Sequence, residues 1–185
     1  MKLKLDFVTK VPKVAKDNRV ILIKDKTTQN KIVKSLNKSL NKSIFANKLF
    51  LERKFLIQNL NDKIYIFVNC TKSKTSLDYE KLGSNLFLFL KNNKIEKSFF
   101  ETNSSQITNI QLEKFLHGAQ LKSYEFNVYK TDKSKNLTIN LYVVGHKSKK
   151  TNLLRNKLNS LLEGVFLTRD LVSEPGNVLH PDEYA

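Results

Sequence analysis

The residue types that could carry out catalysis are few in this chain of 185 residues, and they lie far apart along it. His117, His146 and His180 are the three histidines, and none has another His, Cys or carboxylate beside it at the spacing of a zinc site. The nucleophile pattern G-x-S-x-G is absent. We therefore predict no catalytic, cofactor-binding or metal-binding residue within the chain.

The single cysteine, Cys70, ends the apolar run "IYIFVNC", which predicts a buried and inert thiol rather than a nucleophile. A lone cysteine excludes an internal disulfide and fits a reducing compartment, so we predict a cytoplasmic location. The longest apolar runs have five residues, whereas a membrane span needs about 20. The opening "MKLKLDFV" alternates charged and apolar residues, as a strand does and a secretory signal does not.

Glycines and carboxylates add no further site. The five glycines are isolated, so no loop resembles a P-loop or a dinucleotide-binding turn. Asp78 and Glu80 fall at a predicted helix start, as do Asp182 and Glu183. The positive end of the helix dipole explains carboxylates at such positions without any catalytic role.

The net charge of +16 is the strongest compositional signal, and it raises the possibility of nucleic-acid binding. Only four of the 33 basic residues are arginine, however, and direct base recognition favours the forked guanidinium. The lysines are spread along the chain without a block of five or six, and the 20 asparagines share their A-rich codons. A solvated basic surface is the favoured interpretation, with a basic nucleic-acid-binding α/β module as the alternative.

Apolar patterns of period two, or continuous apolar runs, predict strands at six places. These are Leu3 to Val8, Arg19 to Ile23, Lys63 to Val68, Ile95 to Phe100, Tyr124 to Tyr129 and Leu137 to Val144. The stretch from Leu49 to Leu60 is ambiguous, and we favour a strand there. The short link "KTDKSKN" between the last two strands predicts a hairpin, and hence a mixed sheet with at least one antiparallel pair.

Helical spacing of apolar residues predicts helices between these strands. The three sets are Ile32, Val33, Leu36 and Leu40, with Thr28 as N-cap; Leu77, Leu82, Leu86 and Leu90; and Ile107, Ile110, Leu112, Phe115 and Leu116. Alternation of strands and helices is typical of an α/β sheet covered by helices. A longer helix is predicted from Asn152 to Val172, followed by the turn "SEPGN" and a new helix start at Pro181.

Two stretches of the last third resemble the leucyl (cytosol) aminopeptidase family. The first, Leu112 to Ser134, is similar to the family pattern "GxxLxxYxFxxYK", through Gly118, Leu121, Tyr124, Phe126, Tyr129 and Lys130. The second, Glu163 to Ala185, is similar to the joint between the two domains of the family, through Arg169, Asp170, Leu171, Glu174, Pro175, Asn177 and Pro181. Thr168 and Gly176 stand where the family usually has alanine.

The resemblance implies an amino-terminal α/β domain of macro-domain type over residues 1–150, a linker helix over 151–174 and a truncated start of the catalytic domain over 175–185. The family enzyme is a hexameric di-metal exopeptidase, with manganese or zinc, that removes amino-terminal residues from peptides. Its metal-binding segment "N-T-D-A-E-G-R" does not occur here. We therefore expect this chain alone to be inactive, as a truncated product, a split gene or an isolated domain, with residues from Leu171 onward poorly anchored and the linker helix frayed beyond Phe166.

Overall fold

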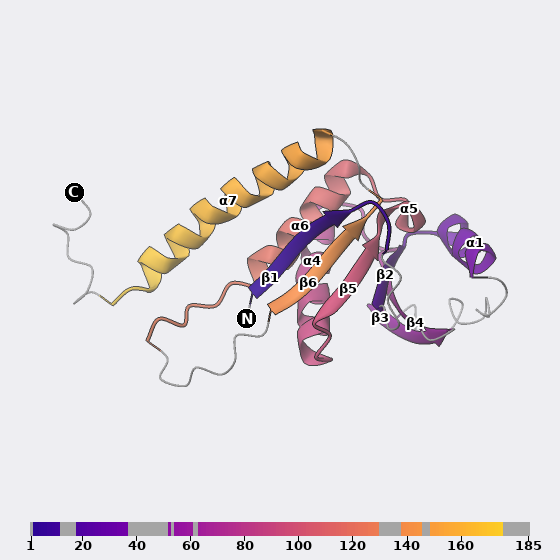
Figure 1. The fold of residues 1–185 in the computed structure, drawn as a ribbon, viewed down its shortest axis with the longest axis horizontal. Coiled ribbons are helices and arrows are strands. Elements are labelled where there is room, and N and C mark those ends of the chain that lie inside the picture. Colours follow the sequence, from indigo (N-terminus) through magenta and orange to yellow (C-terminus); the bar gives the residue numbers. More distant parts are fainter. Residues whose placement is uncertain are drawn as a thin grey trace.

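Six strands form one mixed sheet in the computed structural model, which describes residues 2–11, 18–36, 52, 54–60, 63–129, 138–145 and 149–175 (Figure 1). The strands are β1 (Lys2–Val8), β2 (Asn18–Ile23), β3 (Phe55–Leu60), β4 (Lys63–Asn69), β5 (Lys97–Glu101) and β6 (Thr138–Val144). Their order across the sheet is β1-β6-β5-β2-β4-β3. All neighbours are parallel except β3 and β4, which are antiparallel.

Helices cover both faces of this sheet. They are α1 (Lys26–Ser35), α4 (Ser76–Asn92), the single turn α5 (Thr102–Ser105), α6 (Asn109–Lys122) and α7 (Lys149–Ser173). Strand β2 shows why two layers are needed: Val20 and Leu22 belong to the larger core under α4 and α6, whereas Ile21 and Ile23 belong to the smaller core under α1. Successive side chains of a strand point to opposite faces, so a continuous apolar strand requires cover on both.

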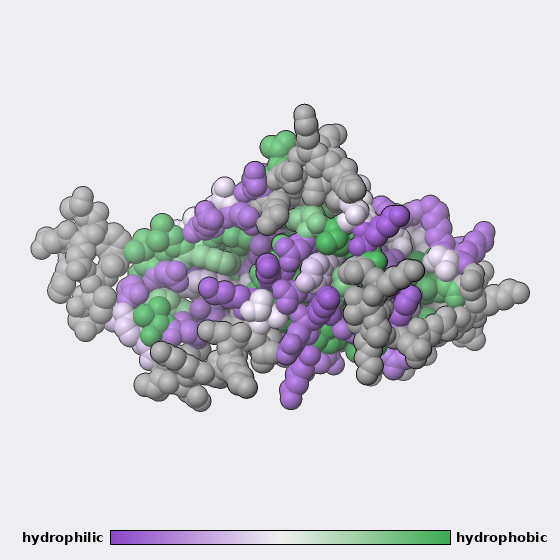
Figure 2. All heavy atoms as spheres, viewed as in Figure 1, coloured by the Kyte–Doolittle hydropathy of each residue, from purple (hydrophilic) through white to green (hydrophobic). Residues whose placement is uncertain are grey.

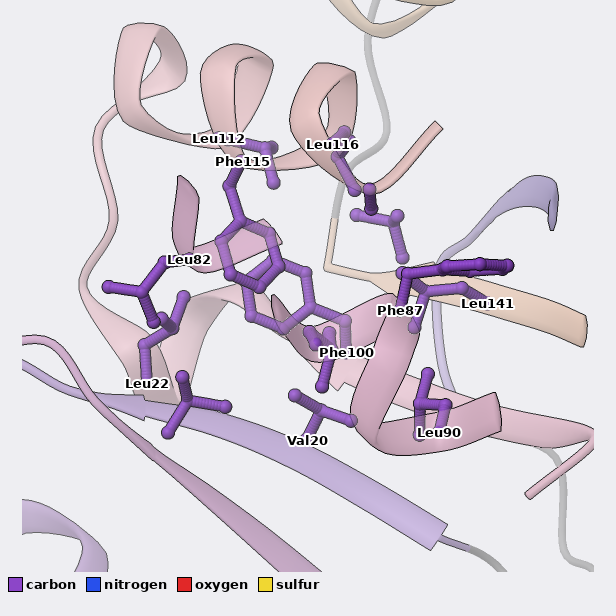
Figure 3. Close-up of a cluster of buried hydrophobic side chains, with 14 of the residues drawn as sticks. Val20, Leu22, Leu82, Phe87, Leu90, Phe100, Leu112, Phe115, Leu116 and Leu141 are labelled. Atoms are coloured by element: carbon purple, nitrogen blue, oxygen red, sulfur yellow. The ribbon is translucent and has the colours of Figure 1, made fainter. Parts of the chain in front are cut away.

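The larger core is rich in aromatic side chains. Phe100 of β5 packs against Phe115 of α6 with their ring centroids 5.1 Å apart, and both are fully buried (Figure 3). Leu158 of α7 is buried in the same cluster. This core therefore holds α7 to the sheet through the amino-terminal half of that helix.

Helices α4 and α6 approach each other so closely that two glycines are required at their crossing. A Cβ atom at Gly118 would lie 1.9 Å from the carbonyl oxygen of Glu80, and one at Gly83 would lie 1.8 Å from that of Phe115. The Ser84 hydroxyl donates a hydrogen bond to the Gly118 carbonyl across this crossing, at 2.8 Å. Gly118, which the family resemblance marks, thus has a packing reason.

Several predictions from the sequence are confirmed by these elements. The mixed α/β sheet flanked by helices and the long final helix are both present. Five of the six predicted strands are found within two residues of their expected ends, and the favoured strand in Leu49 to Leu60 is found as β3. Cys70 is buried, at 2% exposure, as its apolar surroundings predicted.

The predicted strand from Tyr124 to Tyr129 is wrong, and so is the hairpin that was expected to follow it. Residues 123–129 contain no strand, although "YEFNVY" alternates as a strand would. The reason is tertiary: both edges of β6 are already occupied, by β1 and β5, so no hydrogen-bonding partner is left for a hairpin strand. The antiparallel pair of the mixed sheet is instead β3 with β4.

The predicted N-cap of the first helix is also wrong. Asp25 caps α1 by accepting a hydrogen bond from the backbone N–H of Thr28, at 2.7 Å. The same carboxylate accepts the Thr28 hydroxyl at 2.9 Å, so Thr28 lies in the first turn as a buried partner of the cap. Both residues suit an N-cap by type, and only their backbone positions distinguish them.

Candidate functional site

The two stretches that carry the family resemblance contact each other in the folded chain. The loop 123–129, which follows α6, lies against the carboxyl-terminal half of α7. The Tyr124 hydroxyl donates a hydrogen bond to the Asp170 carboxylate at 2.7 Å, and the Tyr124 ring centroid lies 5.2 Å from that of Phe166. Burial and the hydrogen bond to Asp170 both raise the pKa of Tyr124, because each favours the neutral phenol.

Arg169 is the central side chain of this contact. Its Nη1 donates a hydrogen bond to the carbonyl oxygen of Leu121 at 3.0 Å. Leu121 lies in the last turn of α6, where backbone carbonyls lack partners within the helix and carry partial negative charge. The guanidinium also lies 5.4 Å from the centroid of the Tyr124 ring, within the range of a cation–π interaction. One side chain therefore ties α7 both to the end of α6 and to the loop after it.

A second tyrosine extends the contact beyond the end of α7. The Tyr129 hydroxyl donates a hydrogen bond to the carboxylate of Glu174, the residue after the helix. That bond raises the pKa of Tyr129 because only the neutral phenol can donate it, and the negative charge of Glu174 acts in the same direction. Phe126 packs on the Tyr129 ring, with centroids 5.8 Å apart. We name the set Tyr124, Tyr129, Phe166, Arg169, Asp170 and Glu174 the helix clamp.

A cavity of about 400 Å³ adjoins the helix clamp, between the start of β1 and the loop 123–129. Glu125 lines this cavity and accepts a hydrogen bond from the Lys91 ammonium at 2.6 Å. That hydrogen bond is the largest cause that lowers the pKa of Glu125 to about 2. The carboxylates facing this cavity, Glu125 and Asp170, are thus already hydrogen-bonded within the chain.

Side chains of both charges line a second cavity, of about 270 Å³, at the carboxyl end of β4. Lys54, Lys72, Lys81, Glu52 and Asp78 all line it. Asp78 accepts hydrogen bonds from two backbone N–H groups at the start of α4 and completes the capping box with Thr75, which lowers the pKa of Asp78. Because both signs of charge alternate around this cavity, it favours no class of charged ligand.

Ligands of α/β sheets usually bind beyond the carboxyl ends of the strands, at the point where neighbouring strands lead to opposite faces. Here that point is the end of β2, which leads to α1 on one face while β4 and β5 lead to α4 and α6 on the other. The turn α5 fills it. Ser105 is buried and accepts a hydrogen bond from the Leu22 backbone N–H at 3.0 Å, and the Thr102 hydroxyl donates to the Val144 carbonyl at 2.7 Å.

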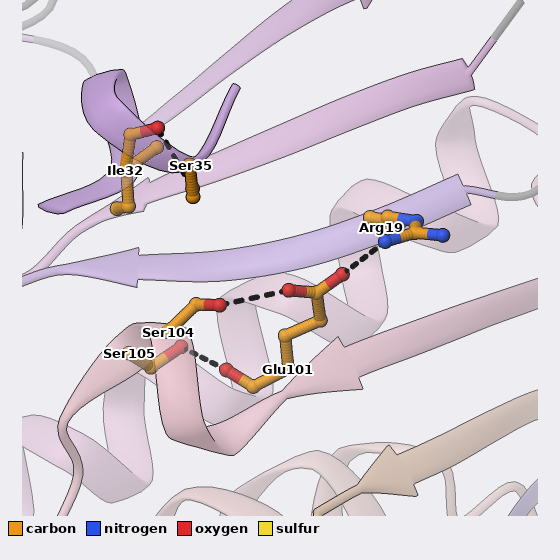
Figure 4. A network of polar contacts seen from close by, with 6 residues as sticks. All are labelled: Arg19, Ile32, Ser35, Glu101, Ser104 and Ser105. Carbon is orange, nitrogen blue, oxygen red and sulfur yellow. Dashed lines mark hydrogen bonds and ion pairs between the residues drawn. The ribbon is translucent and has the colours of Figure 1, made fainter. Parts of the chain in front are cut away.

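A polar network holds α5 in this position (Figure 4). The Glu101 carboxylate accepts hydrogen bonds from Arg19 of β2 and from the Ser104 hydroxyl, each at 2.8 Å. The Ser105 hydroxyl donates to the backbone carbonyl of Glu101 at 2.6 Å. The described residues at this end of the sheet thus bind one another, which gives no support to a nucleotide site there.

The remaining titratable residues do not converge either. His117 lies with its Nδ1 3.5 Å from the Glu80 carboxylate, and neither ring nitrogen has a hydrogen-bond partner among the described residues. His146 and His180 lie outside the described residues, as do Asp182, Glu183 and the predicted helix start at Pro181. Burial raises the pKa of the Cys70 thiol to about 12. Within the described ranges no group of three His, Cys, Asp or Glu side chains could hold a metal ion.

Helix α7 ends at Ser173, beyond the point near Phe166 where fraying was expected, and the helix clamp holds that last part. Its apolar residues range from buried to largely exposed. Leu158 and Leu162 are buried, whereas Leu161, Leu167 and Val172 are 47%, 61% and 80% exposed. Figure 2 shows hydrophobic residues gathered at the end of the molecule where α7 projects. None of the described helices is long and apolar enough to cross a membrane.

Comparison with known proteins agrees with the fold. No model of a known protein family matches the sequence. A probable cytosol aminopeptidase of Treponema denticola is 28% identical over 159 residues, which are 81% of this chain and 32% of that protein. One of Gluconobacter oxydans is 41% identical over 69 residues, 36% of this chain and 14% of that protein. The chain thus spans about a third or less of the length of these relatives.

Solved structures show the same fold at low sequence identity. A mutant of tomato leucine aminopeptidase matches with a TM-score of 0.72 at 16% identity, over 100% of this chain and 41% of that one. A bottromycin maturation enzyme in complex with Mn matches with a TM-score of 0.62 at 12% identity, over 92% of this chain and 34% of that one. In both, the matched part is less than half of the solved chain.

Proposed function

Because the chain is homologous to part of the leucyl (cytosol) aminopeptidases, we propose that it is the non-catalytic, amino-terminal part of an enzyme of this kind. Such an enzyme is a di-metal exopeptidase that removes amino-terminal residues from peptides. In this proposal residues 1–150 form an amino-terminal α/β domain, residues 151–174 a linker helix, and residues 175–185 the start of the catalytic domain. Peptide substrates, a hexameric assembly and a cytoplasmic location belong to the same proposal.

The observation that carries this proposal is the helix clamp. Arg169 and Asp170 come from the stretch that resembles the interdomain joint, and each binds the other resembling stretch, through Leu121 and Tyr124 respectively. These contacts hold helix α7 in one orientation up to Ser173. The larger hydrophobic core contacts the helix only near Leu158. A helix fixed near Leu158 and again close to its carboxyl-terminal end can set the position of a domain that follows it, which gives this part of the enzyme a positioning role.

The described residues do not fit the two divalent metal ions of the family reaction. A two-metal site needs several carboxylate or histidine donors that converge, and the described ranges contain no group of three His, Cys, Asp or Glu side chains that could hold a metal ion. The carboxylates of the clamp are occupied by tyrosine hydroxyls. The proposal therefore assigns both metals to the catalytic domain of the complete enzyme, and we derive no catalytic step within this chain.

Hydrolysis of a leucyl-amide substrate tests the non-catalytic role directly. We expect the purified chain to release no amino acid with added manganese or zinc, while the full-length Treponema denticola relative, purified and assayed in parallel, serves as the positive control. Turnover by the chain above a mock preparation would contradict the proposal. Sequencing the coding region beyond Ala185 tests whether the chain is part of such an enzyme. We expect a downstream reading frame that encodes the metal-binding segment. Its absence would mean that the protein no longer has the function of the family.

A second candidate function, nucleic-acid binding, rests on one observation, the net charge of +16. Binding by lysines through phosphate contacts should weaken with salt, by about 0.9 log units per contact for each tenfold rise in salt concentration. A titration with duplexes of different sequence at physiological salt separates the two cases. Sequence-selective binding would favour this function, whereas weak binding that salt abolishes is the behaviour of any basic surface.

A further inference from the structure

Strand β1 lies at one end of the sheet and offers a row of backbone groups on its outer side. In a parallel pair, alternate residues direct their N–H and C=O groups at the neighbouring strand. Val8 is such a residue, because its carbonyl accepts the backbone N–H of Gly145 at 3.1 Å. The register with β6 then leaves Leu3, Leu5 and Phe7 with outward-directed groups, and the structure gives these groups no hydrogen-bond partner among the described residues. Such an edge is a template for another strand.

The side chains of β1 make this edge self-complementary. Antiparallel pairing of two copies about a two-fold axis at Leu5 places Leu3 opposite Phe7 of the second copy and Leu5 opposite its counterpart. These are hydrogen-bonded pairs, in which both residues exchange N–H···O bonds. The same register places Lys4 directly opposite Asp6, twice, in the non-hydrogen-bonded positions where side chains are closest. Within one strand Lys4 Nζ and Asp6 Oδ2 lie 3.9 Å apart, so pairing replaces this contact with two contacts between copies. Without Asp6 the lysines of the two edges would only repel each other.

The opposite face of the edge has room for the apolar side chains of a second copy. A two-fold axis normal to the sheet keeps the faces together, so Leu5 and Phe7 of the second copy lie on the same face as those of the first. A cavity of about 230 Å³ opens beside this edge, lined by Leu3, Lys4, Leu5, Phe7, Gln120, Leu158 and Asn159. Gln120 is 8% exposed, and its buried Oε1 has no hydrogen-bond partner within the part of the chain that the structure describes.

We propose that β1 is a dimerisation strand, which pairs antiparallel with β1 of a second copy of this chain to form one continuous sheet. Three features support it: unpaired backbone groups on alternate residues, opposite charges in register, and space on the apolar face. The proposal does not depend on the aminopeptidase function, because it uses only the edge of the sheet. The partner is a second copy of this chain, because the charges along β1 match those of β1 itself in the antiparallel register.

Charge reversal at the two facing positions tests the register. Lys4→Asp places Asp opposite Asp6, and Asp6→Lys places Lys opposite Lys4, so each variant should dimerise about tenfold or more weakly than the natural chain. An equimolar mixture of the two variants restores both opposite-charge pairs and should form a heterodimer, as should the double variant with itself. Sedimentation velocity at low salt measures all four samples. Lys81→Asp, on the exposed side of α4, makes the same charge change elsewhere and should leave dimerisation unchanged.

The mixture makes the result independent of folding defects, because two misfolded variants would not rescue each other. A natural chain that stays monomeric at every concentration, a dimer indifferent to Lys4→Asp, or a mixture no better than its components would each overturn the proposal. Hydrogen exchange adds a site-specific reading. The amides of Leu3, Leu5 and Phe7 should become protected as concentration rises, and concentration-independent protection in a monomer would show that another segment of the chain occupies this edge instead.

Discussion

Removing the Arg169 side chain should release the carboxyl-terminal half of α7 without unfolding the sheet. In Arg169→Ala the hydrogen bond to the Leu121 carbonyl is lost, together with the cation–π contact to Tyr124. A hydrogen bond to a charged group contributes about 1.5–3 kcal/mol, and an exposed cation–π contact about 0.5–1 kcal/mol. Because Arg169 is half-buried, we take about 2 kcal/mol as the combined contribution of the hydrogen bond and the cation–π contact to the stability of this half of α7. Alanine is the better helix former by a few tenths of a kcal/mol, which acts in the opposite direction.

Because 1.4 kcal/mol is tenfold in an equilibrium constant, the opening equilibrium of this half of α7 should rise by about thirtyfold. Hydrogen exchange should show faster exchange from Phe166 to Ser173, with the amides of β2 and β4 unchanged. Arg169→Lys keeps the charge but loses the planar donor, so its exchange should fall between the two. Thr168→Ala, one residue away on the exposed side, is the matched control. Exchange in Arg169→Ala equal to that of the natural chain would refute the clamp.

Three further perturbations have expected outcomes. Gly118→Ala should lower the free energy of unfolding by about 3 kcal/mol, because its Cβ would lie 1.9 Å from the Glu80 carbonyl oxygen. Gly164→Ala, which has open space around its Cβ, should raise the free energy of unfolding by about 1 kcal/mol. Urea titrations of both variants measure these changes. Cys70, whose thiol pKa is raised to about 12, should react with a thiol reagent at pH 8 only as fast as the protein unfolds, and rapid native-state reaction would contradict its burial. The pKa of Tyr129 is raised by Glu174, so its contribution to stability is present below the unfolded pKa near 10 and is lost as pH rises through the folded value. The opening equilibrium of the last turn of α7, obtained from exchange rates corrected for the base catalysis common to all amides, should therefore rise in alkali, and Tyr129→Phe should remove this additional pH dependence.

The sequence by itself determined most of the local structure, because period and capping depend on neighbouring residues. The apolar runs ending at Ile23, Val68 and Val144 are strands, and the helical spacing from Leu77 to Leu90 lies within α4. The resemblance carried by Gly118, Tyr124, Arg169 and Asp170 pointed to the relatives found by comparison.

Only the tertiary structure decided which segments meet. The alternating residues from Tyr124 to Tyr129 satisfy the pattern of a strand, yet β1 and β5 already occupy both sides of β6, so the loop packs on α7 instead. The contact of Arg169 with Leu121 joins residues 48 positions apart, a separation at which no local pattern acts. The order of the sheet likewise places β1 at an edge through pairings between distant strands. Hydrogen-bonding capacity is shared across the whole sheet, so competition among distant segments, and not local preference, settles these outcomes.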